Sequence, residues 1–449
     1  MAESTSRCLD DWLTWMETLH PSEIDLGLSR ITDVGSRLGI QKASSKAVTV
    51  AGTNGKGSCV HALESLLLSS GATVGTYTSP HIQRYNERIR LNGDCVSDEQ
   101  LCSAFEKINQ ARAEVSLTYF EFGTLAALLL FQESSLDFWV LEVGLGGRLD
   151  AVNIIDPDIA IITSIDLDHE SWLGESREVI AVEKLGILRP GIPCVCSETR
   201  LTKSMETGFQ QNDVSLYLRG DAFGFQRDQT STRFHYSLFQ RAEHERENGD
   251  LVKTISIDTP ALPLPSVSAA LQAFELCSTL HNAVSLDSEE ITKVVASLTL
   301  PGRFELIETP VMTVVLDVAH NPAATKLLAD NLEQRVGHAD YAVIAMMSDK
   351  KMSAALAPIC SLVSHWLPAK IEYLDRSASS NDLGAALSDL DVGDDKVQLC
   401  QNVPQALETI VDSTAKPSPS VDKPTVLVFG SFFTVEAAKA WINDRFGER

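Results

Sequence analysis

Residues 49–63, TVAGTNGKGSCVHAL, combine residue types that can bind a phosphate group. Glycines allow backbone N–H groups to turn toward an anion at the start of a helix, and Lys56 adds a positive charge. The usual nucleotide-binding loop reads G-x-x-x-x-G-K-[ST], but here Gly57 separates Lys56 from Ser58. The stretch alone therefore allows two interpretations, a phosphate loop or a tight strand-to-helix turn with a solvated lysine.

A second candidate group is the carboxylate of Glu142, which ends the apolar segment FWVLE. A carboxylate at the end of a buried strand is costly unless it is paired or bound to a metal, so Glu142 is a candidate Mg²⁺ ligand. The glycines that follow, in GLGG, do not match the dinucleotide fingerprint G-x-G-x-x-G and indicate little on their own.

Polar residues also follow two other predicted strands. Ser79 comes after the strand predicted at 74–77, and His169 follows the strand predicted at 158–165. Because the carboxyl ends of parallel strands share one edge of a sheet, we expect both residues to lie near Glu142. His169 is then either a structural histidine or a metal ligand, and the residue pattern leaves both interpretations open.

Further candidates occur later in the chain. Lys184 lies beside Glu183 on a predicted helix, and from the residues alone the two form a solvated charged pair. In the C-terminal part, Asp317 again ends a predicted strand, His320 follows it, and Arg303 lies in the segment LPGRFE. Both parts of the chain thus carry phosphate-compatible groups, which predicts a site between two domains.

These groups need a scaffold that places strand ends together. Short apolar strands alternate with segments of helical spacing, which predicts an α/β fold with a largely parallel sheet. A small antiparallel excursion is predicted at about 201–259, where the chain is polar and turn-rich. We predict two domains: residues 1–299, a P-loop-type, mostly parallel sheet with helices, and residues 300–449, a smaller Rossmann-like α/β domain. Strands are predicted at 47–52, 74–77, 137–144, 158–165, 313–320, 341–347 and 425–431, and helices at 58–70, 266–281 and 323–332.

The composition limits the class of function. The formal net charge is −24, from 37 basic and 61 acidic residues, which argues against a nucleic-acid or anionic-membrane partner. The longest apolar run, 125–131, is too short to cross a bilayer, and the N-terminal segment lacks the apolar core of a signal peptide. Nine scattered cysteines without a C-x-x-C pair favour neither a disulfide framework nor a zinc site. We therefore predict a cytoplasmic protein, and we expect it to be a monomer that acts on small molecules.

Nine motifs occur in the order and spacing of one known family. They are AGTNGKGS, YTSPH, LTYFEFGT, LEVGLGGRLDAVN, TSIDLDHESWLG, EKLGILRPG, LPGRFE, DVAHNP and GSFFTV. With these motifs the chain resembles, from about residue 25 to residue 434, the folylpolyglutamate synthase/dihydrofolate synthase family of Mur-ligase-like, ATP-dependent amide ligases. The G-K-G-S spelling of the loop separates this branch from cell-wall Mur ligases, whose loop usually reads G-K-T-[ST].

The resemblance implies ATP and Mg²⁺ as cofactors. Lys184 corresponds to a family lysine that is carboxylated to a carbamate and helps to hold a second magnesium, which replaces the solvated pair as its interpretation. Lys56, Lys184 and His169 would be catalytic. The residues that would bind ATP are Thr53, Asn54, Gly55, Lys56, Gly57, Ser58, Ser266, Arg303, Asp317 and His320. The metal ligands would be Ser79, Glu142, His169 and Lys184.

Three segments resemble the pterin-binding surfaces of family members that use dihydropteroate. They comprise Glu23, Ile24, Asp25 and Leu26, then Thr118, Tyr119, Phe120 and Glu121, and finally Leu149, Asp150 and Ala151. The chain departs from the family at Ser266, where asparagine is common, and at Ser348 and Phe433, where histidine is frequent. The departure at Ser266 predicts a weaker or replaced side-chain contact to ATP.

The reaction that the resemblance implies is activation of a carboxylate by ATP as an acyl phosphate, which the amine of L-glutamate attacks. The motifs resemble bifunctional bacterial members, so we predict addition of glutamate both to dihydropteroate and to reduced folates. Closure of the smaller domain over the ATP/glutamate cleft is a hypothesis. The alternatives are a folylpolyglutamate synthase only, another Mur-type amino-acid ligase, a P-loop NTPase switch and a non-catalytic scaffold.

Overall fold

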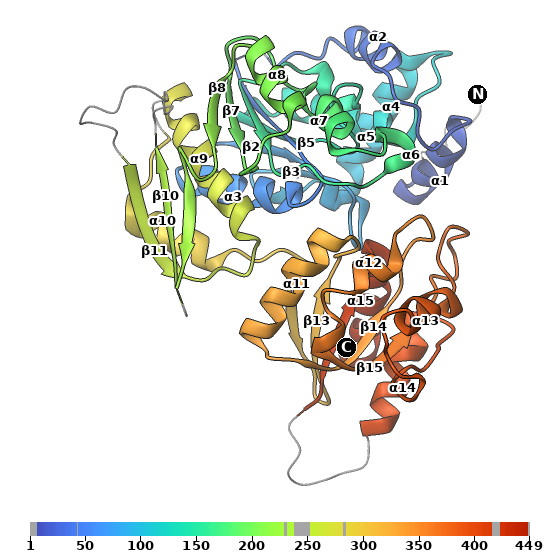
Figure 1. Cartoon of the computed structure of the whole chain (residues 1–449). Coiled ribbons are helices and arrows are strands. Elements are labelled where there is room, and N and C mark those ends of the chain that lie inside the picture. The colour runs from blue at the N-terminus through green and yellow to red at the C-terminus, as the bar shows by residue number, and fades with distance from the viewer. Residues whose placement is uncertain are drawn as a thin grey trace, which may run out of the picture. The chain divides into compact units, whose positions relative to one another are not determined.

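Alternating strands and helices build both parts of the chain, as Figure 1 shows. The computed structural model describes residues 7–42, 44–228, 231–237, 252–281, 284–414 and 423–447. The chain forms two units, Met1–Leu298 and Thr299–Arg449, which we describe one at a time. In this described part, every helix is too short or too polar to span a membrane.

The first unit contains a large sheet flanked by helices. Its helices are α1 (Leu9–Leu19), α2 (Ser29–Arg37), α3 (Lys56–Ser69), α4 (Asp98–Arg112), α5 (Tyr119–Glu133), α6 (Glu170–Leu173), α7 (Arg177–Leu185), α8 (Lys203–Gln211), α9 (Leu264–Leu280) and α10 (Ser288–Ser297). Its strands are β1 (Lys46–Ala51), β2 (Val74–Tyr77), β3 (Ile89–Leu91), β4 (Asp94–Cys95), β5 (Phe138–Glu142), β6 (Ile159–Ile162), β7 (Pro193–Cys196), β8 (Ser215–Leu218), β9 (Gly224–Arg227), β10 (Ser231–Ser237) and β11 (Val252–Asp258).

Eight of these strands form one sheet in the order β4-β3-β2-β5-β1-β6-β7-β8. The six strands from β2 to β8 run parallel, and β3 and β4 add an antiparallel edge. The mostly parallel α/β fold predicted from the sequence is therefore confirmed. Because β1, β2, β5 and β6 are neighbours, the loops that follow these four strands emerge at one edge of the sheet.

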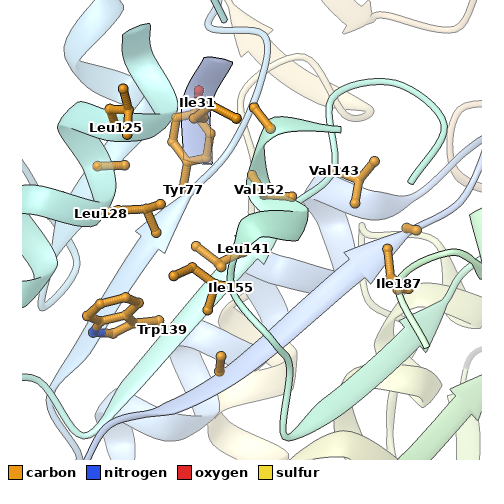
Figure 2. Close-up of a cluster of buried hydrophobic side chains, with 14 of the residues drawn as sticks. Ile31, Tyr77, Leu125, Leu128, Trp139, Leu141, Val143, Val152, Ile155 and Ile187 are labelled. Atoms are coloured by element: carbon orange, nitrogen blue, oxygen red, sulfur yellow. The ribbon is translucent and has the colours of Figure 1, made fainter. Parts of the chain in front are cut away.

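Both faces of the large sheet are buried, and successive strand residues alternate between them. Helices α3 and α9 contact each other and cover one face, where α3 meets β1 and β5 and α9 meets β6 and β7. The other face joins α1, α2, α4, α5, α7 and α8 in one core. Figure 2 shows Leu128 of α5 and Ile155 close to Trp139 and Leu141 of β5. Burial on both faces explains why these strands are continuous apolar runs in the sequence.

The antiparallel excursion is smaller than the 201–259 that the sequence predicts. Residues Lys203–Gln211 form α8, and β8 extends the parallel sheet by pairing with β7. Only β9, β10 and β11 form the separate antiparallel sheet. The boundary was misplaced because α8 is mostly polar, and its buried stripe consists of just Met205 and Phe209, four residues apart.

The second unit has its own sheet in the order β12-β13-β16-β14-β15. Strand β12 is antiparallel to β13, and the other four strands run parallel. Its core packs α11, α12 and α13 against one sheet face, and α14 and α15 contact β14 and β16. The elements are β12 (Glu305–Glu308), β13 (Thr313–Asp317), α11 (Pro322–Arg335), β14 (Ala339–Ile344), α12 (Met352–Leu356), β15 (Val363–Pro368), α13 (Ser380–Ser388), α14 (Val403–Thr414), β16 (Thr425–Phe429) and α15 (Phe432–Phe446).

Separate cores predict separate responses to core substitutions. Leu128 in the first unit and Leu427 in the second are both fully buried. Leu128→Ala should lower the free energy of unfolding of the first unit by about 2–5 kcal/mol, through lost burial and the cavity that remains. Hydrogen exchange in dilute urea should show faster exchange in β1 and β5 and unchanged exchange in β13 and β14. Leu427→Ala is the matched control with the opposite pattern, and equal loss of protection in both units would contradict separate cores.

Candidate active site

The loop between β1 and α3, residues 52–55, is named the glycine loop here. Gly55 has a φ of +82° at the N-cap of α3, where a side chain would be strained. A Cβ on Gly52 would lie 1.9 Å from Thr163 Oγ1, and one on Gly55 would lie 2.4 Å from Ser266 Oγ. The first turn of α3 leaves N–H groups without partners inside the helix, which makes its start suitable for an anion. The helix begins at Lys56, two residues earlier than predicted.

Three side chains from separate segments hold the carbonyl oxygens of the glycine loop. The hydrogen bonds run from Lys184 Nζ to Gly52 (2.9 Å), from Thr163 Oγ1 to Asn54 (2.8 Å) and from Ser266 Oγ to Gly55 (3.0 Å). These bonds satisfy the carbonyls and restrict the backbone conformation of the loop. The Ser266 hydroxyl therefore holds the backbone of the glycine loop. Ser266 is also the residue at which the sequence predicts a weaker or replaced side-chain contact to ATP.

Two lysines converge on one of these carbonyl oxygens. Lys56 Nζ lies 3.1 Å from the carbonyl oxygen of Gly52, which Lys184 also contacts. Lys184 is only 4% exposed, and Glu183 pairs with Arg148 at 2.9 Å, so the solvated Lys184–Glu183 pair is wrong. Burial, and then the charge of Lys56, lower the pKa of Lys184 to about 7. A neutral amine is therefore accessible near neutral pH.

The glycines after β5 let the backbone approach its neighbours closely. A Cβ on Gly147 would lie 2.8 Å from the carbonyl oxygens of both Glu183 and Lys184. A Cβ on Gly144 would lie 2.6 Å from the ring of Phe120. The GLGG segment thus packs against the end of α7 that carries Lys184, and against a predicted substrate residue.

The carboxylate of Glu142 lies beside the first turn of α3. Glu142 is 4% exposed and accepts a hydrogen bond from the Ser79 N–H at 3.1 Å. A Cβ on Gly57 would lie 3.5 and 3.7 Å from its two oxygens, which are ordinary contact distances. Ser58 Oγ is buried without a hydrogen-bond partner among the described atoms. A buried carboxylate and an unsatisfied hydroxyl are oxygen ligands of the kind that Mg²⁺ takes, so these residues fit a magnesium ion.

The segment that carries His169 is tied to the glycine loop. The Asp166 N–H donates to Thr53 Oγ1 at 3.0 Å, and this hydroxyl donates to the Asp166 carbonyl at 3.2 Å. His169 is exposed and has a φ of +52°, which is uncommon for a residue with a side chain. No group of three or more His, Cys, Asp or Glu suited to a metal exists among the described residues. The predicted ligand set contains only two such residues, Glu142 and His169, and the role of His169 stays a prediction.

Arg30, which the sequence analysis missed, connects two predicted substrate segments. Its Nη1 donates to Asp25 Oδ2 at 2.7 Å, and its Nη2 lies 3.1 Å from Glu121 Oε1. Glu121 is 3% exposed and accepts the Thr118 N–H at 2.8 Å, which caps α5. The only local signal for Arg30 is its position five residues after Asp25, at the start of α2.

The second and third predicted segments both contact the turn that follows β5. The ring of Phe120 covers Gly144 and lies 5.9 Å from the ring of Tyr77.

Asp150 is buried, and its two oxygens accept the N–H groups of Leu145 at 2.9 Å and Val152 at 3.0 Å. Burial raises the pKa of Asp150 to about 6, while these backbone donors act in the opposite direction. Of the other predicted substrate residues, Glu23 is exposed, Ile24, Leu26, Tyr119 and Leu149 are half-buried, and Ala151 is buried.

The second unit brings together its own predicted residues. Asp317 ends β13, and its Oδ2 accepts the N–H of Phe304 at 2.8 Å, so the loop of Arg303 adjoins the strand end. The Arg303 guanidinium stacks over the ring of Phe432 at 5.0 Å. Burial raises the pKa of Asp317, while Arg303 favours its charged form. Their contacts to ATP, and that of His320, stay predictions.

Comparison with known proteins connects this geometry to characterised sequences. Residues 50–191 match the Mur ligase middle domain, and residues 302–432 match the Mur ligase glutamate ligase domain. The dihydrofolate synthase/folylpolyglutamate synthase of Escherichia coli (strain K12) is 38% identical over 97% of this chain and 96% of its own length. The structure of E. coli FolC in complex with DHPP and ADP has a TM-score of 0.83 at 36% identity, over 98% of this chain and 99% of that chain. A bifunctional folylpolyglutamate synthase/dihydrofolate synthase with Mn, AMPPNP and L-glutamate bound has a TM-score of 0.82 at 35% identity, over 99% and 100% of the two chains.

The lowered pKa of Lys184 makes stability depend on pH. The amine titrates near 10.5 in the unfolded chain and near 7 in the folded protein, so between these values the unfolded chain binds more protons. Stability should therefore rise with pH above about 7, whereas the cost of burying the charged amine is fully present below 7. Lys184→Met should abolish this rise, which is at most about 1.4 kcal/mol per pH unit.

Urea unfolding of the first unit between pH 6.5 and 9, with chelator and without bicarbonate, measures this difference. Lys293→Met, which removes an exposed lysine of α10, is the control and should stay parallel to the parent protein. A constant difference between the parent and Lys184→Met over this range would contradict a lowered pKa at Lys184.

Proposed function

The chain belongs to the dihydrofolate synthase/folylpolyglutamate synthase family, and from this premise we propose how its residues carry out the reaction. The protein is an ATP-dependent amide ligase that uses a divalent metal ion. It adds L-glutamate to dihydropteroate, which forms dihydrofolate, and adds further glutamates to reduced folates. The observation that carries the residue assignments is the glycine loop with its carbonyls held and Glu142 beside the following turn.

The chemistry requires a leaving group because a carboxylate is a poor electrophile. Transfer of the γ-phosphoryl group of ATP to a substrate carboxylate oxygen gives an acyl phosphate and ADP. The amine of L-glutamate attacks the acyl carbon, the C–O bond to phosphate breaks, and the nitrogen loses a proton as the amide forms. Two anions, the γ-phosphate and the carboxylate, must approach each other, so the site has to offset negative charge.

The glycine loop and Lys56 would supply much of that positive potential. Backbone N–H groups at the start of α3 face no partner within the helix and can donate to phosphate oxygens. In the free protein the Lys56 ammonium rests on the Gly52 and Thr53 carbonyls at 3.1 and 3.4 Å. A bound phosphate would replace these neutral acceptors with charged ones, which are stronger partners.

Glu142, Ser58 and Ser79 would hold the metal ion, together with His169. The bound ion would neutralise phosphate charge and orient the phosphate oxygens. Lys184 would contribute after its neutral amine adds to the carbon of CO₂ and loses one proton to water, since the resulting carbamate offers anionic oxygen ligands whereas an ammonium would repel a cation. The burial of Lys184 and its lowered pKa support this assignment.

The two acidic side chains joined by Arg30 would recognise the pterin. A pterin ring presents adjacent N–H donors, which carboxylate oxygens of Asp25 or Glu121 can accept. Glu121 Oε1 contacts the Arg30 guanidinium, but the two groups are not aligned for a hydrogen bond. This oxygen can therefore still accept a hydrogen bond from a ligand. Phe120 adds an aromatic surface next to Gly144 for a flat ligand. Asp150 would act indirectly, by holding the turn after β5.

The partners and the compartment are part of the proposal. We propose a cytoplasmic monomer that acts on dihydropteroate, reduced folates and L-glutamate and binds no nucleic acid. The formal net charge of −24 supports this, because a strongly acidic surface repels nucleic acid and anionic membranes.

The reaction predicts that ATP turnover requires both co-substrates. ADP release should need L-glutamate together with either dihydropteroate or tetrahydrofolate, and should fall to background when either partner is omitted. Lys56→Ala should lower turnover by about 100-fold or more, because one charged group at the phosphates is lost. Coupled detection of ADP measures both arms. ADP release without glutamate and pterin would favour an NTPase switch, and turnover only with tetrahydrofolate would leave a folylpolyglutamate synthase.

The position of Gly57 predicts a specific effect on metal binding. Gly57→Ala puts a methyl group at ordinary contact distance from Glu142, so the free protein should stay folded while space for the metal is reduced. We expect Mn²⁺ affinity in the presence of AMPPNP to fall about tenfold or more, as measured by electron paramagnetic resonance of free Mn²⁺. Gly35→Ala is a matched control, since Gly35 also lies in a helix, α2, and its methyl would contact the apolar side chains of Leu125 and Ile154 at 3.6 Å. Unchanged Mn²⁺ affinity in Gly57→Ala would reject a metal at this carboxylate.

A further inference from the structure

A buried ion pair links helix α3 to strand β3, which lies next to the edge strand β4. Glu64, on α3, is 2% exposed, and its Oε2 accepts a hydrogen bond from Arg90 Nη2 at 2.7 Å. Arg90 Nε lies 3.0 Å from Glu64 Oε1, and Thr76 Oγ1 of β2 donates to the same oxygen at 2.8 Å. The pair therefore joins the helix that follows the glycine loop to the two neighbouring strands β3 and β2.

The remaining nitrogen of Arg90 contacts the segment that carries Ser79. Arg90 Nη1 donates to the carbonyl oxygen of Glu87 at 3.3 Å and lies 3.5 Å from Thr78 Oγ1. The carboxylate of Glu87 in turn accepts three backbone N–H groups of the same segment. These donors are Ile82 at 2.8 Å, Gln83 at 2.9 Å and Arg84 at 2.7 Å. Residues 78–88, named the Ser79 segment here, are thus organised around Glu87 and fastened to Arg90.

The charges of this pair persist in the folded protein. Burial raises the pKa of Glu64, but the hydrogen bonds from His61, Arg90 and Thr76 and the charge of Arg90 outweigh it and lower the pKa to about 2. Buried ion pairs of this kind often contribute little net stability, because desolvation cancels much of the attraction. A role in orientation accounts better for the geometry, since Arg90 uses its planar fork to contact Glu64 and the Ser79 segment at once.

We propose that Arg90 is a positioning residue that fixes the Ser79 segment to α3 and thereby sets Ser79 against Glu142. The inference rests on the proposed function, in that it takes Ser79 and Glu142 as metal ligands. Ser79 is held to Glu142 by its N–H at 3.1 Å, and α3 carries Gly57 alongside the same carboxylate. Through Glu64 and Arg90, the helix of the glycine loop and the Ser79 segment share one anchor. Outer-shell contacts of this kind set the geometry of the ligands that touch a metal.

The test is Arg90→Lys, which keeps a positive charge for Glu64 but has a single nitrogen and cannot also reach the Ser79 segment. We expect about tenfold weaker Mn²⁺ binding in the presence of AMPPNP, measured by electron paramagnetic resonance, and unchanged AMPPNP affinity in EDTA. Glu87→Gln leaves the Arg90–Glu64 pair intact and disturbs the Ser79 segment from within, so it should weaken Mn²⁺ binding similarly. This second variant keeps the test decisive if Arg90→Lys does not fold.

Lys253→Met is the control, because it disturbs a different ion pair of the first unit, in which Lys253 contacts the buried carboxylate of Glu275 on α9. It should lower thermal stability and leave Mn²⁺ affinity unchanged. Parent-like Mn²⁺ affinity in both Arg90→Lys and Glu87→Gln would overturn the proposal and make the pair merely structural. Glu142→Ala separates the proposed metal site from this inference: if Glu142→Ala abolishes Mn²⁺ binding while neither Arg90→Lys nor Glu87→Gln weakens it, only this inference fails. If Glu142→Ala has no effect, the proposed metal site fails and the inference fails with it.

Discussion

A loop can bind an anion through its N–H groups only if its carbonyl oxygens are satisfied elsewhere. In the glycine loop, hydrogen bonds from Lys184, Thr163 and Ser266 meet this constraint at three of the four carbonyls, those of Gly52, Asn54 and Gly55. These donors come from α7, from the segment after β6 and from α9, so the loop conformation depends on the packing of the whole first unit. The strand order β2-β5-β1-β6 matters because it brings Thr163, which follows β6, and Glu142, which ends β5, to the same edge as the glycine loop after β1.

The same dependence explains where the chain uses glycine. Gly147 is needed because the backbone of α7 occupies the space that its side chain would take. Gly144 is needed because the ring of Phe120 occupies the corresponding space. Gly57 differs, since a methyl group would fit beside Glu142 at ordinary distances in the free protein. The extra glycine in G-K-G-S is therefore not required by the fold. The metal ion proposed at Glu142 would need the open space that Gly57 leaves beside this carboxylate.

The sequence predicts well what depends on local pattern. The positions of β1, β2, β5 and β6 and the α/β class follow from apolar runs. A strand that is buried on both faces appears in the sequence as a continuous apolar run, which is easy to recognise. The role of Ser266 and the connection made by Arg30 could not be predicted, since each depends on contact between segments 91 to 211 residues apart. Lys184 illustrates the difference. Its local surroundings suggest a solvated pair, and only the fold shows that Glu183 turns to Arg148 while Lys184 turns inward.

The meeting of Lys56 and Lys184 on one carbonyl oxygen has a chemical consequence. Their nitrogens lie 3.1 and 2.9 Å from the Gly52 oxygen, so two ammonium groups there would repel each other in a buried setting. The lowered pKa of Lys184 expresses that repulsion together with its burial. Conversion of Lys184 to an anionic carbamate would turn the repulsion into attraction, and the carbamate nitrogen would keep one N–H that can still donate to the Gly52 carbonyl. The protein has a formal charge of −24 and so offers no broadly basic surface for a polyanion. With Lys184 as an anionic carbamate and Lys56 as a cation, the site itself would carry one group for a bound cation and one for a bound polyanion.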